Sequence, residues 1–164
     1  MRKTLFFLFI SSTLFISCYS YKVFPEEYRT IKYEAKKKLA YIINPELRPE
    51  YEIFSSSGIF DLTKDSLDTT ALKIKLCPLR KNIACGQPIM ASALTLGQLP
   101  VYLPDRYFYR FDQVSSGDTL SREFELRVAT RFWFWDMFKF KKQFKKYAAL
   151  ALRGKFLKPE LINN

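Results

Sequence analysis

Strict alternation between apolar and charged side chains at residues 123–128, within a strand expected over 120–135, constrains the fold more than any other feature of the sequence. Between residues 123 and 128, three apolar side chains alternate with two glutamates and one arginine. Successive side chains of a β-strand point to opposite faces, so the pattern predicts a strand with one buried and one exposed face. A Ser-Ser-Gly-Asp sequence at 115–118 predicts a turn that joins this strand to a partner over 106–114. We therefore predict a long antiparallel hairpin in a sheet with one face open to solvent.

Weaker patterns predict the remaining elements. A helix is expected over residues 25–43, because Pro25 suits a first helical turn and apolar residues recur every three or four positions until Asn44-Pro45. Short strands are expected at 51–54, 59–62, 72–76 and 90–96. With 48% hydrophobic residues among 164, the chain can bury one core. The predicted fold class is α+β, a small antiparallel sheet of about five or six strands with an N-terminal helix and a basic C-terminal helix.

The C-terminal region carries most of the excess positive charge. Residues 131–158 have a net charge of +8, whereas residues 18–130 have only +2. Apolar residues recur at helical spacing from Met137 to Ala151, which predicts a basic amphipathic helix ending near Arg153-Gly154. Its apolar side can pack on the sheet or lie in a membrane interface, and its basic side can bind an anionic glycan or an acidic protein. The candidate residues for a membrane or anion contact are Trp133, Trp135, Lys139, Lys141, Lys142, Lys145 and Lys146.

The N-terminal segment has the pattern of an export signal. Arg2 and Lys3 precede an apolar run over residues 5–16. A helix of that length measures about 18 Å, too short to cross a hydrocarbon core of about 30 Å. A signal peptide over residues 1–17 therefore fits better than a membrane-spanning helix.

The sequence LFISC, which ends at Cys18, resembles the lipobox of bacterial lipoproteins. In that family a peptidase cuts before the cysteine once its thiol has been diacylated, so the resemblance implies that Cys18 is lipidated and anchors the chain in the cell envelope. Tyr19 is not the aspartate of the enterobacterial sorting rule, which implies the outer membrane. The alternatives are a non-lipidated signal peptide and a signal anchor. The implied organisation is a lipidated tether over 18–24, a single α+β domain over 25–158 and a C-terminal tail over 159–164.

A second resemblance concerns the middle of the chain. Residues 92–100 contain the segment ALTLG followed by two residues and a proline, and a hairpin and a tryptophan-bearing strand come next. This arrangement, which extends to residue 135, is similar to small uncharacterised bacterial lipoproteins. The resemblance implies no particular chemistry.

Composition excludes several kinds of chemistry. The chain contains no histidine, which rules out histidine-based triads and histidine-ligated metals, and it has no Walker or dinucleotide-binding motif. We interpret five acids of the hairpin region as turn and surface residues: Asp105, Asp112, Asp118, Glu123 and Glu125. We expect no enzymatic activity, no cofactor, no metal and no nucleic acid partner. The predicted role is structural or ligand-binding at the membrane surface, with an envelope hydrolase using carboxylates or a surface-exposed ligand-binding lipoprotein as alternatives.

The segment CPLRKNIAC places Cys77 and Cys85 at the ends of a short loop. Outside the cytoplasm such a pair is typical of a disulfide, and the alternative is a pair of buried free thiols in neighbouring strands. The expected result of peptide mapping without reducing agent is one mass that joins the Cys77 and Cys85 peptides. Free thiols at both positions would contradict the bridge.

Overall fold

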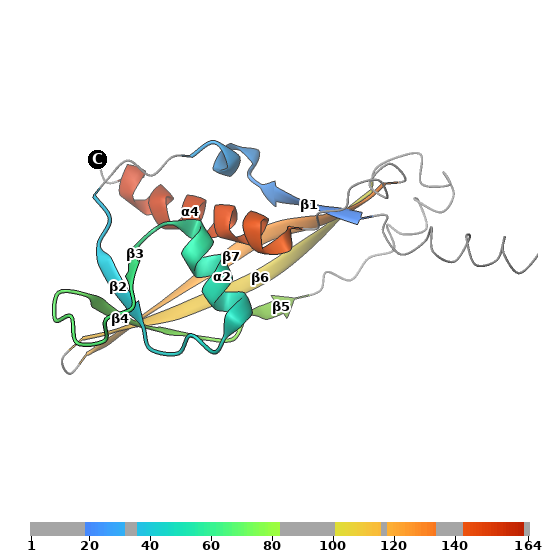
Figure 1. The fold of residues 1–164 in the computed structure, drawn as a ribbon. Helices are drawn as coiled ribbons and strands as arrows, with labels where there is room; N and C mark the ends of the chain where they lie inside the picture. Colours follow the sequence, from blue (N-terminus) through green and yellow to red (C-terminus); the bar gives the residue numbers. More distant parts are fainter. Residues whose placement is uncertain (1–18, 32–35, 83–100, 116–117, 134–142, 163–164) are drawn as a thin grey trace, which may run out of the picture.

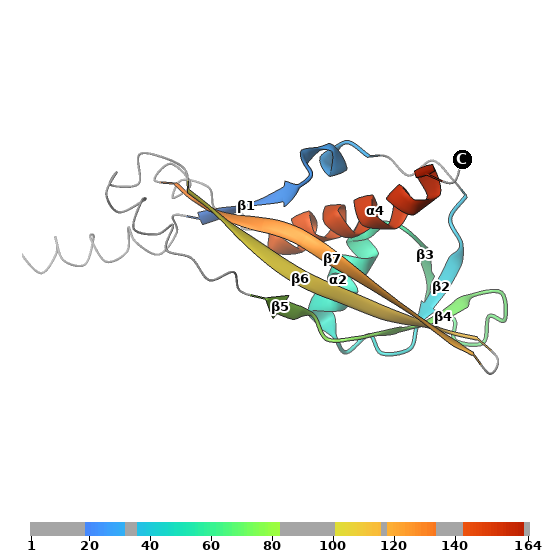
Figure 2. The same cartoon turned by 180° about the vertical axis from the view of Figure 1, so that it is seen from behind.

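A twisted β-sheet carries two helices on one of its faces (Figures 1 and 2). The structure is a computed structural model that describes residues 19–31, 36–82, 101–115, 118–133 and 143–162. Its elements are β1 (Tyr19–Phe24), the 3-10 helix η1 (Glu26–Arg29), β2 (Leu39–Ile42), α2 (Arg48–Ser57), β3 (Asp61–Thr63), β4 (Leu72–Leu76), β5 (Arg80–Asn82), β6 (Val101–Val114), β7 (Thr119–Phe132) and α4 (Phe144–Ile162). The predicted α+β class is confirmed.

The predicted long hairpin is confirmed as β6 and β7, two strands of 14 residues that pair along their whole length from Val101↔Phe132 to Val114↔Thr119. The expected alternation holds on β7, where Leu126 and Val128 are fully buried. The return strand ends at Phe132 rather than continuing to 135. Residues 134 and 135 lie outside the described part of the chain.

The sheet is mixed rather than antiparallel throughout. Within the described residues its strands lie in the order β1-β7-β6-β4-β2-β3, and β5 also pairs with β6. Strand β2 runs parallel to both β3 and β4, whereas the remaining pairs are antiparallel. The parallel pair of β2 and β3 arises because α2 follows β2 and brings the chain back to the start of β3, and residues 64–71 then lead from β3 to β4. The strand predicted at 72–76 is confirmed as β4.

The predicted N-terminal helix over 25–43 is wrong. Pro25 precedes only the single 3-10 turn η1, and the end of the segment forms β2, a strand between two neighbours. Ala40 and Ile42 are its buried residues, at the two-residue spacing of a strand. The expected tether also differs, since residues 19–24 form β1 and pair with β7. Non-local pairing overrides a local pattern that fits a helix.

The predicted strand at 51–54 is also wrong, because these residues belong to α2. The helix has Pro49 in its first turn and ends at Gly58, whose φ of 63° places it in the left-handed region that favours glycine. Its buried residues recur at helical spacing and are Glu50, Ile53, Phe54 and Ser57. The strand expected at 59–62 is shifted to β3, and the one expected at 90–96 lies outside the described residues.

The C-terminal helix exists, but its bounds differ from the prediction. Within the described residues α4 begins at Phe144 and continues past Gly154 to Ile162, so that residues 159–162 are helix rather than tail. Ala148, Ala151 and Leu152 bury its inner side in the core, which the sheet and α2 complete. Residues 137–142, the expected first part of this helix, lie outside the described residues.

Gly154 lies inside α4 rather than at its end. It is the point at which the helix packs closely against η1. A Cβ atom built at Gly154 would lie 2.3 Å from Cγ of Tyr28, the buried aromatic residue of η1. Only a residue without a side chain lets the helix approach the ring this closely. The next residue back, Arg153, donates from Nε to the carbonyl oxygen of Ser57 at 2.6 Å, at the last residue of α2. This contact satisfies a helix-terminal carbonyl and places a positive charge at the negative end of the helix dipole.

We predict that Gly154→Ala destabilises the protein, although alanine ordinarily stabilises a helix interior by about 1 kcal/mol relative to glycine. The added methyl group would overlap the Tyr28 ring, and overpacking of this kind costs about 1–3 kcal/mol. Urea denaturation of the two proteins measures the difference. A double-mutant cycle with Tyr28→Ala provides the control, because the combined loss should be smaller than the sum of the single losses. Strict additivity would show that the glycine and the ring do not interact.

Candidate functional site

The structure describes three of the seven residues predicted to contact a membrane or an anion. Trp133 lies beneath the guanidinium of Arg131, 5.0 Å from the ring centroid, and Lys146 is exposed at the start of α4. Lys145 forms an ion pair with Glu52 of α2. These three residues therefore have different surroundings: an arginine side chain, a glutamate of α2 and solvent. Cys18, Cys85, Trp135, Lys139, Lys141 and Lys142 lie outside the described residues.

The apolar side of α4 packs on the protein core. Phe144 contacts Tyr21 of β1 and Tyr107 of β6, with ring centroids 5.4 Å and 4.7 Å apart. Tyr147 also packs against the core, and Ala151 is buried within it. From residue 144 onward, the apolar stripe is therefore a core face rather than a surface for a bilayer.

Cys77 has a free thiol in the structure, and its Sγ lies 3.7 Å from Oδ2 of Asp112. Burial raises the pKa of the Cys77 thiol, and the negative charge of Asp112 raises it further. This environment disfavours the thiolate, which is the nucleophilic form of cysteine. Since Cys85 lies outside the described residues, the bridge between the two stays a prediction.

The acids of the hairpin are engaged in ion pairs and hydrogen bonds on the open face of the sheet. Glu123 pairs with Arg80, and Asp112 accepts a hydrogen bond from Ser121 Oγ at 2.7 Å, which lowers the pKa of that carboxyl. Asp118 is exposed beside the turn. Among the described residues, no group of three histidine, cysteine, aspartate or glutamate side chains could hold a metal ion.

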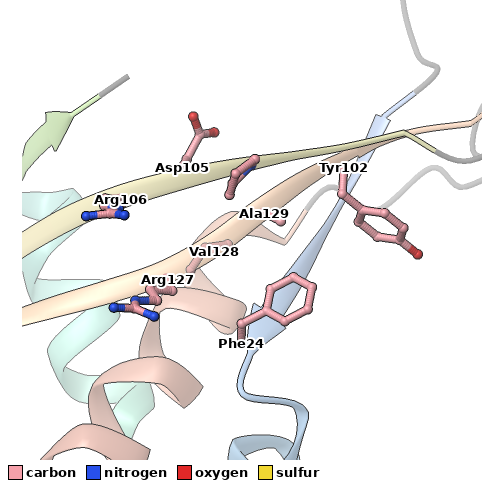
Figure 3. A pocket seen from close by; sticks show the side chains of 8 residues that line it. Phe24, Tyr102, Asp105, Arg106, Arg127, Val128 and Ala129 are labelled. Carbon is pink, nitrogen blue, oxygen red and sulfur yellow. The ribbon is translucent and has the colours of Figure 1, made fainter. Parts of the chain in front are cut away.

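A hollow of about 400 Å³ lies at one end of the hairpin, on the face of the sheet opposite the helices (Figure 3). The rings of Phe24 and Tyr102 form one side of it, with centroids 6.5 Å apart and planes at 85°. The guanidinium groups of Arg106 and Arg127 lie toward its other side. The volume is within the range of small-molecule sites.

The hollow follows from the register of β1, β7 and β6. Lys22, Ala129 and Pro104 lie in one row across the three strands. The rows on either side of it, two residues away along each strand, carry large side chains on β7 and β6, so the small Ala129 and Pro104 leave a gap between them. Proline is tolerated because, among the described strands, this part of β6 pairs with β7 alone and its other edge needs no N–H donor.

Two arginines line the hollow, and a lysine lies close to its aromatic rings. Arg106 and Arg127 share a single carboxylate, Glu125, whose Oε1 lies 3.6 Å and 3.2 Å from their Nε atoms. Lys22 pairs with Glu26, and its Nζ lies 5.4 Å from the ring centroids of both Phe24 and Tyr102. The two arginines with their one acid leave a net positive charge beside an apolar, aromatic surface. Such a combination favours an anion that is joined to an apolar group.

A second polar hollow, of about 230 Å³, also involves residues of β1. Lys22, Arg29 and Arg131 contribute positive charge to it, and Gln143, which directly precedes α4, and Tyr147 of α4 also line it. Strand β1 therefore contributes to two hollows that have basic side chains in or beside them.

The opposite face of β6 carries a buried carboxylate. Asp105, which projects away from Arg106 (Figure 3), accepts a hydrogen bond from Thr130 Oγ1 at 2.9 Å and lies 3.3 Å from Lys81 Nζ. Burial and, to a lesser extent, this carboxylate raise the pKa of Tyr107 to about 12. Asp105 therefore has a hydrogen-bond donor in Thr130 and a positive counter-charge in Lys81.

Comparison with known proteins gives no matching family model and no matching curated protein. None of the helices in the described part of the chain is long and apolar enough to span a bilayer.

The hollow is not apparent in the sequence. Its residues come from three strands, and β1 was expected to be a tether. The one local signal is the series Tyr102, Pro104, Arg106, in which every second residue of a strand is aromatic, small and then basic. That series forms a site only once the register of β6 with β7 and β1 is known.

We predict that Asp105→Asn lowers the pKa of Tyr107 from about 12 while leaving it above the ordinary value, because burial is the larger cause and persists in the variant. Titration of ¹³C-labelled tyrosine rings by NMR measures the change, with Tyr107→Phe to assign the signal. Tyr109, whose pKa is raised by burial and by Glu50 rather than Asp105, provides an internal control. An unchanged Tyr107 titration would contradict the contact.

Proposed function

We propose that this protein is a bacterial cell-envelope lipoprotein, anchored in the outer membrane by acylation of Cys18, with a structural or ligand-binding role at the membrane surface. The observation that carries the proposal is the LFISC sequence placed directly before the first strand of the domain. The short apolar run before Cys18 fits a cleaved signal and is too short to span the bilayer itself.

The position of β1 supports an anchor of this kind. Tyr19 is paired with Phe132, which in turn is paired with Val101, so the sheet begins one residue after Cys18. An acylated Cys18 would therefore be joined to a fixed edge of the sheet rather than to a flexible linker. The domain would be held close to the bilayer, with the end of the hairpin that carries Tyr102 nearest to it.

A binding or structural role accounts for the described surface better than the hydrolase alternative. Glycosidase-type chemistry needs two carboxyl groups about 5–9 Å apart in a cleft. The described hairpin acids Glu123, Glu125 and Asp112 are held by arginines on an open sheet face, and Asp105 is held by Thr130 and Lys81 on the other. The hollow beside β1 offers aromatic rings and cations, which bind ligands without reacting with them.

Metabolic labelling with a fatty-acid analogue tests the anchor. The full-length chain should take up the label in bacteria, and Cys18→Ala should abolish it. Cys77→Ala is the matched control and should remain labelled, because it removes a thiol that belongs to the folded domain. Label that persists in Cys18→Ala, or is absent from the wild type, would overturn the proposal. Separation of inner and outer membranes then tests the location.

A further inference from the structure

We infer that the hollow lined by Phe24, Tyr102, Arg106 and Arg127 holds the anionic phosphate head group of a lipid in the membrane to which the protein is anchored. The inference rests on the proposed function, since it needs the domain to lie at a bilayer. The ligand chemistry comes from the hollow itself: basic groups for a phosphate, and aromatic rings with a small apolar floor for the glycerol and first methylene groups.

The distance from the anchor brings the Tyr102 row of the hollow to head-group level, and the arginine row reaches that level when the strand is tilted. Its three rows cross β1 at Ser20, Lys22 and Phe24, which lie two, four and six residues after Cys18. At about 3.4 Å per residue these rows are roughly 7, 14 and 20 Å along the strand from the acylated residue. The polar layer of one leaflet is about 5–8 Å thick. A strand along the membrane normal keeps the Tyr102 row at the head groups, and a tilted strand brings the arginine row to them as well.

The side chains have the chemistry of that layer. Arg106 and Arg127 contact Glu125 through their Nε atoms, and each guanidinium fork has further N–H donors that can meet phosphate oxygens. Both arginines are more than half exposed. Tyr102 combines an apolar ring with a hydroxyl group, which suits the boundary between head groups and acyl chains. A freely dissolved phosphate would use the cations but would gain nothing from the rings or from the apolar floor.

Vesicle binding by an unacylated chain tests the inference. The protein from residue 18 onward with Cys18→Ala retains every described element and has no lipid of its own. It should sediment with vesicles of phosphatidylcholine containing 30 mol% phosphatidylglycerol and much less with phosphatidylcholine alone. Arg106→Gln/Arg127→Gln should weaken binding about thirtyfold, on the basis of the usual contribution of a basic side chain at an anionic surface.

Lys73→Gln/Lys75→Gln is the matched control. It removes the same charge from exposed residues of β4, which pair with the turn end of the hairpin rather than with the end near Cys18. It should change binding less than threefold. Equal losses in both pairs would mean that overall charge alone causes binding, and retained binding in the arginine pair would assign it to another basic segment. Either result overturns the inference.

Two further measurements test whether the hollow itself binds the lipid and whether the ligand is a lipid or a soluble anion. Ala129→Leu fills the floor of the hollow without changing charge, so it should weaken vesicle binding severalfold while the circular dichroism spectrum stays native. Unchanged binding would overturn the assignment to the hollow. Glycerol 3-phosphate at millimolar concentration should not displace the protein from vesicles, and displacement would show a site for a soluble anion. Because acylation plays no part in this assay, its outcome is independent of the Cys18 labelling experiment.

Discussion

The pairing of β6 with β7 over their whole length is the constraint on which the rest of the structure depends. Two strands of 14 residues extend for about 45 Å, and every residue of each is committed to one of two faces. Tyr109, Phe111, Leu126 and Val128 make one face apolar, so both helices must cover it. The other face carries arginines and glutamates, and neither described helix covers it. The hollow lined by Phe24, Tyr102 and the two arginines lies on that face, away from the helices.

Buried polar groups fix where the helices lie on this hairpin. Glu50 of α2 accepts a hydrogen bond from the backbone N–H of Leu79 at 2.8 Å, and the Tyr109 hydroxyl donates to the Glu50 carbonyl at 2.8 Å. Arg153 then joins α4 to the last turn of α2. Among the described residues no buried side-chain nitrogen or oxygen lacks a partner. Apolar burial alone would permit several placements, whereas these hydrogen bonds are satisfied in one.

The sequence predicted the parts of the fold in which a long pattern and the final environment agree. The hairpin follows from alternation along one of its long strands, and β4 follows from a shorter alternation over its five residues. Residues 25–43 also fit a helix. The strand β2 forms there instead because it pairs with β3 and β4, which come later in the chain and do not contribute to the local pattern. Residues 51–54 fit a strand beside an expected turn at 55–58, yet they belong to α2, which has Pro49 in its first turn and Gly58 as its C-cap. The hollow could not be predicted from the sequence, because its residues come together only through the register of three strands.

An acyl anchor and a head-group site at the same end of the sheet would have different physical roles. Two or three acyl chains already retain a protein at a membrane, so contacts in the hollow would add little to retention. They would instead restrict rotation about Cys18, because the hollow lies on one face of the sheet and Cys18 precedes an edge strand. Since β1 begins one residue later, that restriction would pass directly to the hairpin. The two helices would then face away from the lipid, and the turn between β6 and β7 would lie at the far end of the hairpin from the anchor.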